Sequence, residues 1–348
     1  MKEQLQIDFL PVDSGEKSGD AIAFRYGDFT HRSTFKVVVI DGGTKDSGNR
    51  LVEHIQQYFH TNEVDLVICT HPDADHASGL RQVMNQCVVK ELWIHKPWDH
   101  SEAIRDLFQD GRITGNSLSE RLKLAYNYAH ELVELAEEKG IDVREPFAGR
   151  KTEDGKVNVL GPTVDYYREL IPEFSRSPQQ KTTVLENLTR TFNKAINWIQ
   201  ETLHIETLDD SGITSAVNLS SAVILLEFNN KKYLFTGDAG IQSLEKVLEY
   251  TKNNYIDISN IEFFQVPHHG SKRNISPAIL NAIKCKTAYV SASKDAPKHP
   301  AKKVTNALIR RGANVYKTGG QVISYNNNAP RDGWTSLTPI QFFDQVEE

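Results

Sequence analysis

Two histidines and two aspartates fall within six positions of the segment THPDADH, residues 70 to 76. This segment follows an apolar run, Val64 to Cys69, of the kind that forms a buried strand. Imidazole and carboxylate groups bind divalent cations, and a short loop at a strand end can direct several of them at one point. A protein core would instead have to satisfy each of these polar groups. The cluster therefore predicts a metal site that uses His71, Asp73, Asp75 and His76.

Two later loops carry further candidate ligands, and each again follows an apolar run. Thr236 to Gly240 places Asp238 in a glycine-containing turn, and Val266 to Ser271 contains His268 and His269. Glycine permits the tight backbone bend that sends a side chain past the end of a strand. A Gly-Asp turn alone is more often structural. Three such loops in one chain, however, predict that they meet at a single metal site.

The composition allows a sizeable enzyme. The chain has 348 residues and is 39% hydrophobic and 25% charged, which is typical of an ordinary globular protein. The first residues lack an apolar signal core, and the longest apolar runs are too short to span a bilayer. We therefore expect a cytoplasmic protein without a membrane association. The cysteines, Cys69, Cys87 and Cys285, are odd in number and form no Cys-x-x-Cys pair, so neither a disulfide framework nor a zinc ribbon is indicated.

Apolar periodicity predicts strands at both ends of the chain and helices in the middle. The expected strands are Leu5 to Val12, Asp20 to Tyr26, Phe35 to Ile40, Val64 to Cys69, Glu91 to His95, Val157 to Leu160, Ala222 to Phe228, Lys232 to Thr236, Ile261 to Val266, Thr287 to Val290, Ala313 to Tyr316, Val322 to Tyr325 and Leu337 to Phe343. The expected helices are Asn49 to Phe59, Ser101 to Lys139, Val164 to Ile171 and Thr182 to Leu203. The pattern predicts a single domain, 1–348, with a helical insertion at about 99–210 that is a lid, a surface for a protein partner or plain elaboration.

The charge is unevenly distributed. The net charge is −6 and the pI is about 6.1, which argues against a general nucleic-acid coat protein. Between His268 and Tyr325, however, Asp295 is the only acidic residue, and the basic residues are Lys272, Arg273, Lys284, Lys286, Lys294, Lys298, Lys302, Lys303, Arg310, Arg311 and Lys317. This segment predicts a positive field over the site that attracts phosphates. The alternative is a solvated face that balances acidic stretches elsewhere.

The order of these motifs resembles the metallo-β-lactamase fold. The motifs are Asp41-Gly42-Gly43, His71-x-Asp73-x-Asp75-His76, Gly237-Asp238-Ala239 and His268-His269-Gly270-Ser271. Within that fold, the chain is most similar to the hydrolase domain of ComEC-type competence proteins and their soluble relatives. Three further motifs fit this subgroup: Ser18-Gly19-Asp20-Ala21, Asn218-Leu219-Ser220-Ser221 and His299-Pro300. The resemblance implies an α+β, four-layer αββα sandwich with metals at the sheet edge. DNA uptake is not implied, because we find no membrane channel.

The resemblance also implies a ligand set for two divalent ions. Asp75, His76, Asp238 and one of His268 and His269 would hold the firmer ion, and His71 and Asp73, with Asp238 bridging, would hold the second. Most members have histidine where this chain has Asp73, which shifts preference from Zn²⁺ towards Mn²⁺ or Mg²⁺ without excluding zinc. The usual mid-chain ligand histidine is also missing, with Asn218 near its place, so we expect one ion to be held weakly.

The fold further implies hydrolysis by metal-bound hydroxide, most simply of a phosphodiester in DNA, RNA or a nucleotide. Asp75 would also orient the attacking water or accept its proton. Lys272 and Arg273 are expected to contact phosphate, and His299 would protonate the leaving oxygen or hydrogen-bond phosphate, unless it is simply a surface histidine. Further candidates for substrate binding are Ser271, Asn218 and Ser221.

Two other functions stay open at this point. The same site could hydrolyse a carboxylic ester, thioester or lactone, or the fold could serve as a non-catalytic module that binds nucleic acid or a protein partner. Trp93, His95, Trp98 and His100 could stack a base, although aromatic residues at a strand end usually pack a core edge. Asp20 and Asp41 are expected to fix loops by accepting backbone N–H bonds rather than to bind metal.

Overall fold

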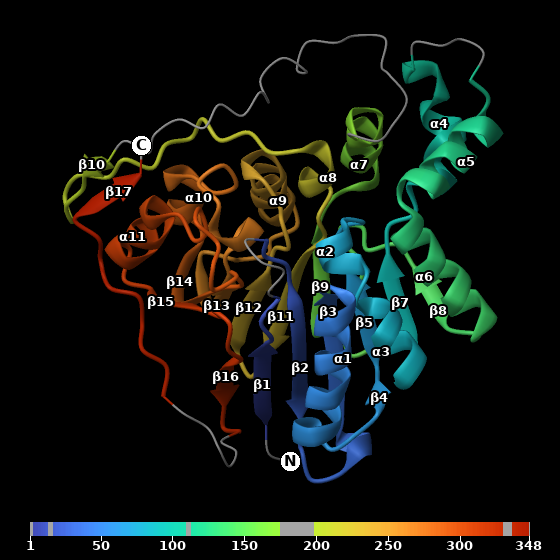
Figure 1. Ribbon diagram of the computed structural model, residues 1–348, viewed down its shortest axis with the longest axis horizontal. Helices are drawn as coiled ribbons and strands as arrows, with labels where there is room; N and C mark the ends of the chain where they lie inside the picture. The colour runs from blue at the N-terminus through green and yellow to red at the C-terminus, as the bar shows by residue number, and fades with distance from the viewer. Residues whose placement is uncertain (1–2, 13–16, 109–112, 175–197, 330–335, 348) are drawn as a thin grey trace.

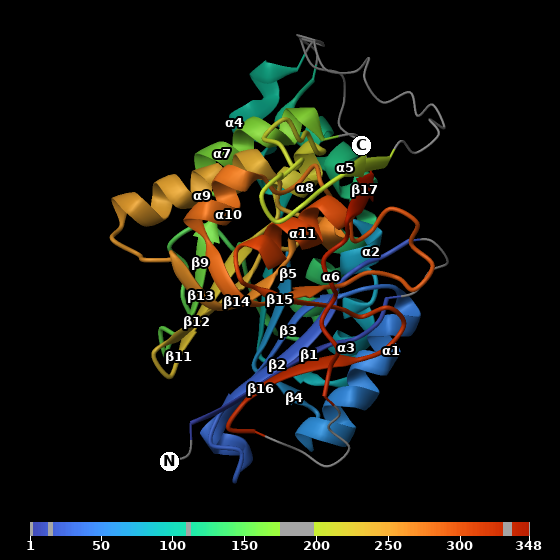
Figure 2. The same cartoon turned by 90° about the vertical axis from the view of Figure 1, so that its left-hand side faces the viewer.

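The computed structural model describes residues 3–12, 17–108, 113–174, 198–329 and 336–347. Two large β-sheets lie face to face, with helices on both outer sides (Figures 1 and 2). Two small pairs of strands accompany them, β4 (Glu63–Val64) with β6 (Val88–Val89) and β10 (Trp198–Gln200) with β17 (Gln345–Glu347).

The first sheet is built mainly from the beginning of the chain. Its strands lie in the order β16 (Ile323–Asn327), β1 (Gln4–Phe9), β2 (Ala21–Gly27), β3 (Phe35–Gly42), β5 (Leu66–Cys69), β7 (Glu91–Ile94) and β8 (Asp142–Arg144). The strands from β16 to β3 are antiparallel, whereas β3, β5, β7 and β8 are parallel. Because parallel strands end at the same edge of a sheet, the loops after β3, β5 and β7 share one edge.

The second sheet repeats this arrangement with later segments. Its order is β15 (Asn314–Lys317), β14 (Lys284–Val290), β13 (Asn260–Gln265), β12 (Lys231–Phe235), β11 (Val223–Phe228) and β9 (Val157–Gly161). The strands from β12 to β15 are parallel, and β11 is antiparallel to both of its neighbours. The loops that carry Asp238 and the two adjacent histidines therefore leave the same edge of this sheet.

Three apolar layers hold the sandwich together. The middle layer lies between the sheets and contains the stacked rings of Phe24 and Phe235, whose centroids are 5.3 Å apart. One outer layer joins the first sheet to α1 (Lys45–His54), α3 (Leu80–Gln86), α5 (Gly115–Ala125) and α6 (Asn127–Glu138). The other joins the second sheet to α9 (Ile241–Asn253), α10 (Pro277–Ala282) and α11 (Lys302–Arg310). The predicted αββα sandwich is thus confirmed.

The middle of the chain supplies helices and also strands. Its helices α4 (Ser101–Ile104), α5 and α7 (Val164–Leu170) rise beyond the carboxyl ends of the strands, as Figure 1 shows. Between them, β8 and β9 each join one of the large sheets. The division into one domain with a helical insertion at about 99–210 stays a prediction. Within the described ranges, every helix is too short or too polar to cross a bilayer.

Three predicted elements differ from the structure. The helical stretch expected at Ser101 to Lys139 is divided, within the described residues, into α4, a 3₁₀ turn at Arg105–Leu107, α5 and α6. Residues 182–197 of the helix expected at Thr182 to Leu203 lie outside the described residues, but its last part is the strand β10, in which Ile199 pairs with Val346. Leu337 to Phe343 is not a strand; the next strand is β17. Pro339 explains part of this, since proline has no N–H group for a strand ladder. For β10, pairing with β17, a segment far away in the sequence, decided the outcome.

Candidate metal centre

The early cluster occupies the end of β5 and the first turn of a short helix. His71 is the second residue after the strand, and Asp73 stands just before α2 (Ala74–Ala77), which carries Asp75 and His76. His71 and His76 are fully buried, and their ring centroids lie 4.2 Å apart. The change from strand to helix within a few residues thus turns both imidazoles to the same side.

Asp238 reaches the early cluster through a tight turn after β12. Gly237 has a φ of +51°, and a Cβ atom there would lie 2.8 Å from Thr70 Oγ1. Glycine is therefore required both for the backbone conformation and for the close approach of the two loops. Gln265 fixes the turn, because its Oε1 accepts the N–H groups of Thr236 and Gly237 at 2.9 and 3.2 Å.

His268 and His269 follow β13 in an unusual backbone conformation. Their φ angles are 47° and 56°, so both adopt the left-handed region that non-glycine residues rarely occupy. Such strain persists only where surrounding contacts enforce it, and it concentrates at functional sites. The consecutive left-handed residues bring both rings to face Asp238.

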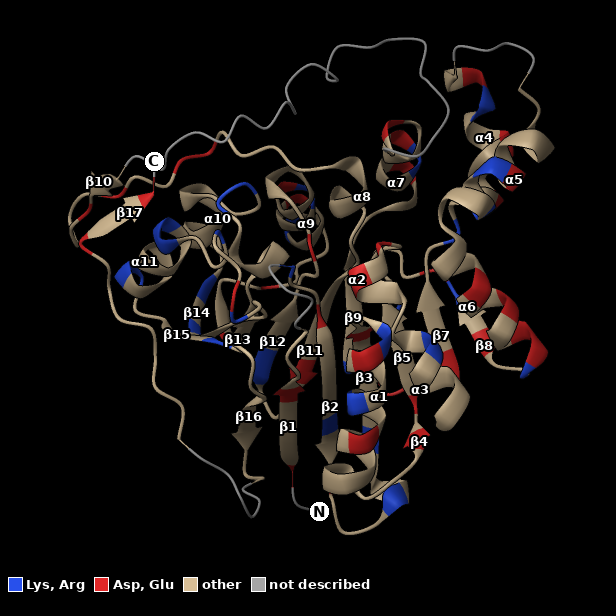
Figure 3. Cartoon of the chain, viewed as in Figure 1, with Lys and Arg blue, Asp and Glu red and all other residues tan. Residues whose placement is uncertain are grey.

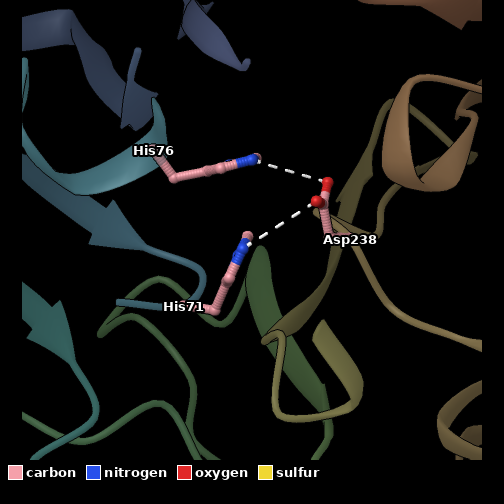
Figure 4. A group of neighbouring side chains, drawn as sticks. All are labelled: His71, His76 and Asp238. Atoms are coloured by element: carbon pink, nitrogen blue, oxygen red, sulfur yellow. Dashed lines mark ion pairs between the residues drawn. The ribbon is translucent and has the colours of Figure 1, made fainter. Parts of the chain in front are cut away.

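Four imidazoles converge on the two oxygens of Asp238. His76 Nε2 and His269 Nε2 lie 3.5 and 3.8 Å from its Oδ1, whereas His268 Nε2 and His71 Nε2 lie 3.6 and 3.9 Å from its Oδ2. Figure 4 shows His71 and His76 pointing at the two oxygens. These separations exceed those of hydrogen bonds. A cation could therefore lie between each pair of nitrogens and the oxygen they face.

The remaining carboxylates of the early cluster, Asp75 and Asp73, lie beside different imidazoles. An oxygen of Asp75 lies within 4.8 Å of ring nitrogens of His76 and His269, and Asp73 Oδ2 lies 3.8 Å from His71 Nε2. We call Asp75, His76, His269 and Asp238 Oδ1 the inner group. We call His71, Asp73, His268 and Asp238 Oδ2 the outer group.

Each imidazole is oriented by a partner at its other nitrogen. His76 Nδ1 lies 2.8 Å from Asp41 Oδ2, and His269 Nδ1 lies 2.8 Å from the Ser291 carbonyl oxygen. Both partners only accept hydrogen bonds, so each Nδ1 carries a proton and each Nε2 is the nitrogen that faces Asp238. Carboxylate and carbonyl partners of this kind accompany most histidines that bind metals.

The outer imidazoles are held in the same way by polar side chains. His268 Nδ1 lies 2.9 Å from Asn274 Oδ1, which must accept because Asn274 Nδ2 donates to the Asp238 carbonyl oxygen at 2.9 Å. His71 Nδ1 lies 3.1 Å from Thr70 Oγ1, whose own proton goes to Asp41 Oδ2 at 2.6 Å. All four Nε2 atoms are thereby left free to face Asp238.

The charges at the centre are strongly coupled. Burial opposes ionisation of Asp238, but His268, His76 and His269 outweigh it and hold the pKa of Asp238 well below its usual range. Burial likewise disfavours a charged His76, yet Asp238 and Asp41 raise its pKa well above the ordinary value. Burial lowers the pKa of His71. Burial also lowers the pKa of His269, to about 4. The site thus keeps a carboxylate ionised among imidazoles.

Several of these groups are buried without a hydrogen-bond partner in the described residues. They include Nε2 of His71, Nε2 of His76 and Oδ1 of Asp238. A buried polar atom without a partner is costly, and here the unpartnered nitrogens and the unpartnered oxygen face one another. Divalent cations would satisfy all of them at once. The donor set therefore fits divalent metal ions, with imidazole and carboxylate ligands suited to Zn²⁺ or Mn²⁺.

Three predicted substrate-binding residues lie in contacts that support the loops. Ser221 Oγ accepts the Asp238 N–H at 3.2 Å, and Ser271 Oγ accepts the Arg273 N–H at 3.2 Å. Asn218 Nδ2 lies 3.2 Å from His268 Nδ1. Asn218, expected near the place of the missing histidine, is thus beside the outer group, where it contacts a ring rather than Asp238. Substrate binding by these residues stays a prediction.

His299, Lys272 and Arg273 lie at the rim of the centre. The His299 ring centroid is 5.7 Å from that of His268 and 6.2 Å from that of His269. Burial and the nearby His268 lower the pKa of His299 to about 4, so its ring is neutral at neutral pH. It can therefore hydrogen-bond a phosphate, whereas an imidazolium acid is disfavoured there. Lys272 is half-buried and Arg273 is exposed, directly after the His268–Ser271 turn.

The predicted positive field is only partly located at the site. Lys286 lies on β14, a strand that ends beside the centre at Val290, and it pairs with Glu262 at 2.8 Å. Arg310 and Arg311 pair with Glu201 and Glu206 at 3.3 and 2.7 Å. Figure 3 shows Lys and Arg positions on α11 and on strands of the second sheet. The expectation that the whole basic segment covers the active site is therefore too broad, because several of its charges are matched by local carboxylates.

The aromatic and histidine cluster after β7 belongs to the core. Trp93, His95, Trp98 and His100 are all less than 9% exposed. His95 stacks on Tyr167 with centroids 4.4 Å apart, and His100 Nε2 lies 3.1 Å from Glu145 Oε1. Rings enclosed in this way cannot stack a base, so the structure favours the core interpretation.

The sequence did not reveal the residues that orient the ligands. Asp41 accepts the Thr70 backbone N–H at 2.8 Å, as expected, but it also holds His76. Asp20 accepts no backbone N–H among the described residues. It accepts a hydrogen bond from Gln265 Nε2 at 2.6 Å and lies beside the inner group. The expectation that Asp20 fixes a loop through the backbone is therefore wrong. The motif Ser18-Gly19-Asp20-Ala21 was its only signal, whereas Gln265 and Asn274 had none.

The sandwich and its convergent imidazole and carboxylate groups define a metal-dependent hydrolase. A family model described as the Metallo-beta-lactamase superfamily matches residues 33–294, and the chain belongs to this superfamily. The predicted likeness to ComEC-type proteins is confirmed over about a third of the chain. Recombination protein 2 of Haemophilus influenzae is 33% identical over 36% of this chain, and ComE operon protein 3 of Bacillus subtilis is 30% identical over 29%. These matches span only 16% and 12% of the two relatives.

Solved structures of the fold are more distant. A putative metallo-β-lactamase from Thermotoga maritima is 13% identical, with a TM-score of 0.35, and the match covers 74% of this chain and 94% of that one. A diphosphatase of the PhnP family is 11% identical, with a TM-score of 0.39, and the match covers 93% of this chain and 98% of that one. Neither likeness bears on the substrate of this protein.

Proposed function

We propose that this protein is a phosphodiesterase or nuclease that depends on divalent metal ions and acts on nucleic acid or a nucleotide. The observation that best supports the proposal is that one loop contributes to both the metal centre and a basic rim. The turn that supplies His268 and His269 continues directly into Lys272 and Arg273. A phosphate held at the centre would therefore meet ammonium and guanidinium groups at the same loop.

The electrostatics of the rim support an anionic substrate. Burial lowers the pKa of Lys272, and the positive charges of Lys303 and Arg273 lower it further. Cations that repel one another in this way would be stabilised by a bound phosphate. Asp209 offsets part of this charge, since its carboxylate is close enough to Lys303 and Lys272 for them to contribute to its lowered pKa.

Each group of residues at the centre and its rim would have a separate role in hydrolysis. The inner and outer groups would each hold one ion, and two such ions lower the pKa of a water and stabilise charge on a phosphate. Asp75, at the edge of the inner group and partly exposed, would orient the water and accept its proton. Lys272 and Arg273 would bind the phosphate oxygens. His299, neutral at this site, would hydrogen-bond the leaving group or a neighbouring phosphate.

The metal preference follows from the carboxylate content. Asp73 supplies an oxygen where most members of the superfamily have an imidazole, and oxygen is the harder ligand. We propose Mn²⁺ or Zn²⁺ as the native ions, with Mg²⁺ as a weaker substitute. Assays should therefore include all three.

Purified protein loaded with Mn²⁺, Zn²⁺ or Mg²⁺ is incubated with single-stranded DNA, double-stranded DNA, RNA, cyclic nucleotides, and a thioester and a lactone as contrasting substrates. Asp238→Asn serves as the inactive reference that exposes any contaminating nuclease. The double variant Lys272→Ala/Arg273→Ala tests the rim, and Lys286→Ala is its matched control, because Lys286 belongs to the same basic segment but pairs with Glu262.

We expect phosphodiester cleavage that Asp238→Asn abolishes, that the double variant reduces by roughly 10- to 100-fold, and that Lys286→Ala leaves unchanged. Turnover of the thioester or lactone alone, unaffected by the double variant, would show the esterase function instead. Salt-sensitive nucleic-acid binding without any turnover would show a non-catalytic binding module. Either result would overturn the proposal.

A further inference from the structure

Asp20 is brought to the metal centre from the start of the chain. It lies just before β2 and is 1% exposed. Its neighbour Gly19 packs so closely on α2 that a Cβ atom there would lie 2.4 Å from the Asp75 carbonyl oxygen. The glycine therefore allows Ser18 to Asp20 to pass close to the turn that carries Asp75 and His76.

Gln265 ties Asp20 to the turn of Asp238. Its Oε1 accepts two backbone N–H groups of that turn, so its Nε2 must be the atom that donates to Asp20 Oδ2, at 2.6 Å. One buried side chain thus fixes both carboxylates in position relative to each other. It also requires Asp20 Oδ2 to act as an acceptor.

The other oxygen of Asp20 has no such partner. Oδ1 is buried and lacks a hydrogen-bond partner in the described residues. An oxygen of Asp20 lies within 4.8 Å of ligand atoms of Asp238 and His269, both members of the inner group. A buried carboxylate oxygen without a donor is costly, and a cation held by the inner group is the charge best placed to compensate it.

We infer that Asp20 is a further ligand of the inner metal ion, contributed by the loop before β2. The inference rests on the proposed metal centre and is independent of the substrate. It gives the inner ion three carboxylate residues, Asp20, Asp75 and Asp238, beside the imidazoles of His76 and His269. A set so rich in oxygen, with five protein ligands, favours Mn²⁺ over Zn²⁺, because zinc is usually held by four ligands in a tetrahedron.

Asp20→Asn tests this role with little change in shape. The asparagine oxygen can still accept from Gln265, so its NH₂ group would replace Oδ1 and face the cation with a donor. Asp8→Asn is the matched control: Asp8 on β1 is equally buried and accepts from Gln6 at 2.8 Å, but it pairs with His54 away from the centre. Mn²⁺ binding is measured by calorimetry and metal content by elemental analysis after dialysis.

We expect Asp20→Asn to raise the Kd of the tighter Mn²⁺ by about 10-fold or more and to shift the preference towards Zn²⁺, with Asp8→Asn unchanged. Unchanged Mn²⁺ affinity and content in a folded Asp20→Asn protein would refute the assignment.

If the variant does not fold, a crystal structure of the wild-type protein with Mn²⁺ decides. An Asp20 oxygen at about 2.2 Å from an ion supports the assignment, and one beyond about 3 Å overturns it. Wild-type protein that binds two ions but cleaves no phosphodiester would instead refute the proposed function alone.

Discussion

The inner and outer groups use the same kinds of side chain but differ in their surroundings. His76 and His269 of the inner group are at most 4% exposed and are oriented by Asp41 and a backbone carbonyl. In the outer group, the side chains of His268 and Asp73 are 28% and 42% exposed. Desolvated, rigid ligands hold a cation more firmly than mobile, hydrated ones. We therefore expect an ion in the inner group to stay bound and an ion in the outer group to exchange and meet the substrate.

Asp238→Asn should have the largest effect, because the two oxygens of Asp238 face both groups. The amide keeps one neutral oxygen and places an NH₂ group where the other oxygen was, so one ion loses its oxygen ligand and all four imidazoles lose the negative charge that they face. We expect less than one tightly bound equivalent of metal and a loss of hydrolysis of about 1000-fold. Elemental analysis after dialysis and steady-state assays check this. Retention of one full equivalent would show that the two groups do not share Asp238.

His269→Asn and His268→Asn form a matched pair that separates the groups. Both residues have left-handed backbones, which asparagine tolerates well, so the substitutions should perturb the fold equally. We expect His269→Asn to weaken the tighter ion by about 100-fold and His268→Asn to weaken only the looser ion, by about 10-fold. Calorimetric titration with Mn²⁺ or Zn²⁺ measures both constants. Equal effects on the same ion would remove the distinction between the groups.

Asp41→Asn tests the support behind the inner group. Asp41 belongs to neither the inner nor the outer group, although one of its oxygens lies within 4.8 Å of ligand atoms of Asp20 and His76; it accepts from His76 Nδ1, Thr70 Oγ1 and the Thr70 backbone N–H. An amide can satisfy only some of these donors and no longer polarises His76. We expect the inner Kd to rise about 10-fold, while the outer Kd changes little. The same titration provides the measurement, and a selective effect on the outer ion would contradict the assignment.

We expect the smallest effect from a substitution of His95, which is a buried imidazole outside the inner and outer groups. Burial, with a smaller contribution from His100, lowers its pKa from 6.5 to about 3. A lowered pKa means that the folded state disfavours protonation, so this contribution to stability is present above pH 6.5 and is lost as the pH falls towards 3. In metal-free protein, His95→Phe should reduce the loss of unfolding free energy between pH 7.5 and pH 5 by about 1–2 kcal/mol. Denaturant titrations at the two pH values measure it; identical pH dependence in both proteins would contradict it.

The sequence predicted the parts of this site that are local. His71 to His76 lie within six residues after an apolar run, and Asp238 and His268 follow strands of their own, so their chemistry and their place at strand ends could be inferred together. The order of motifs then implied the sandwich, which the structure confirmed. The strands that carry these loops also lie close to their predicted bounds, because alternating and continuous apolar runs dominate them.

What the sequence could not supply depends on contacts between distant segments. The sharing of His268 and His269 between the two oxygens of Asp238 results from consecutive left-handed residues, which no composition rule indicates. Gln265 connects the turn of Asp238 to Asp20, which lies 245 positions before Gln265 in the sequence. The strand pair β10 and β17 is likewise decided by long-range pairing, so local periodicity predicted a helix where β10 lies.

Electron paramagnetic resonance of the wild-type protein loaded with Mn²⁺ tests most directly whether Asp238 joins two ions. We expect two equivalents of manganese per chain and the spectrum of an exchange-coupled pair, since ions in such centres lie about 3.5–4 Å apart. Asp238→Asn should remove the coupling. The spectrum of isolated Mn²⁺ from the fully loaded wild-type protein, or fewer than two equivalents bound, would contradict the account.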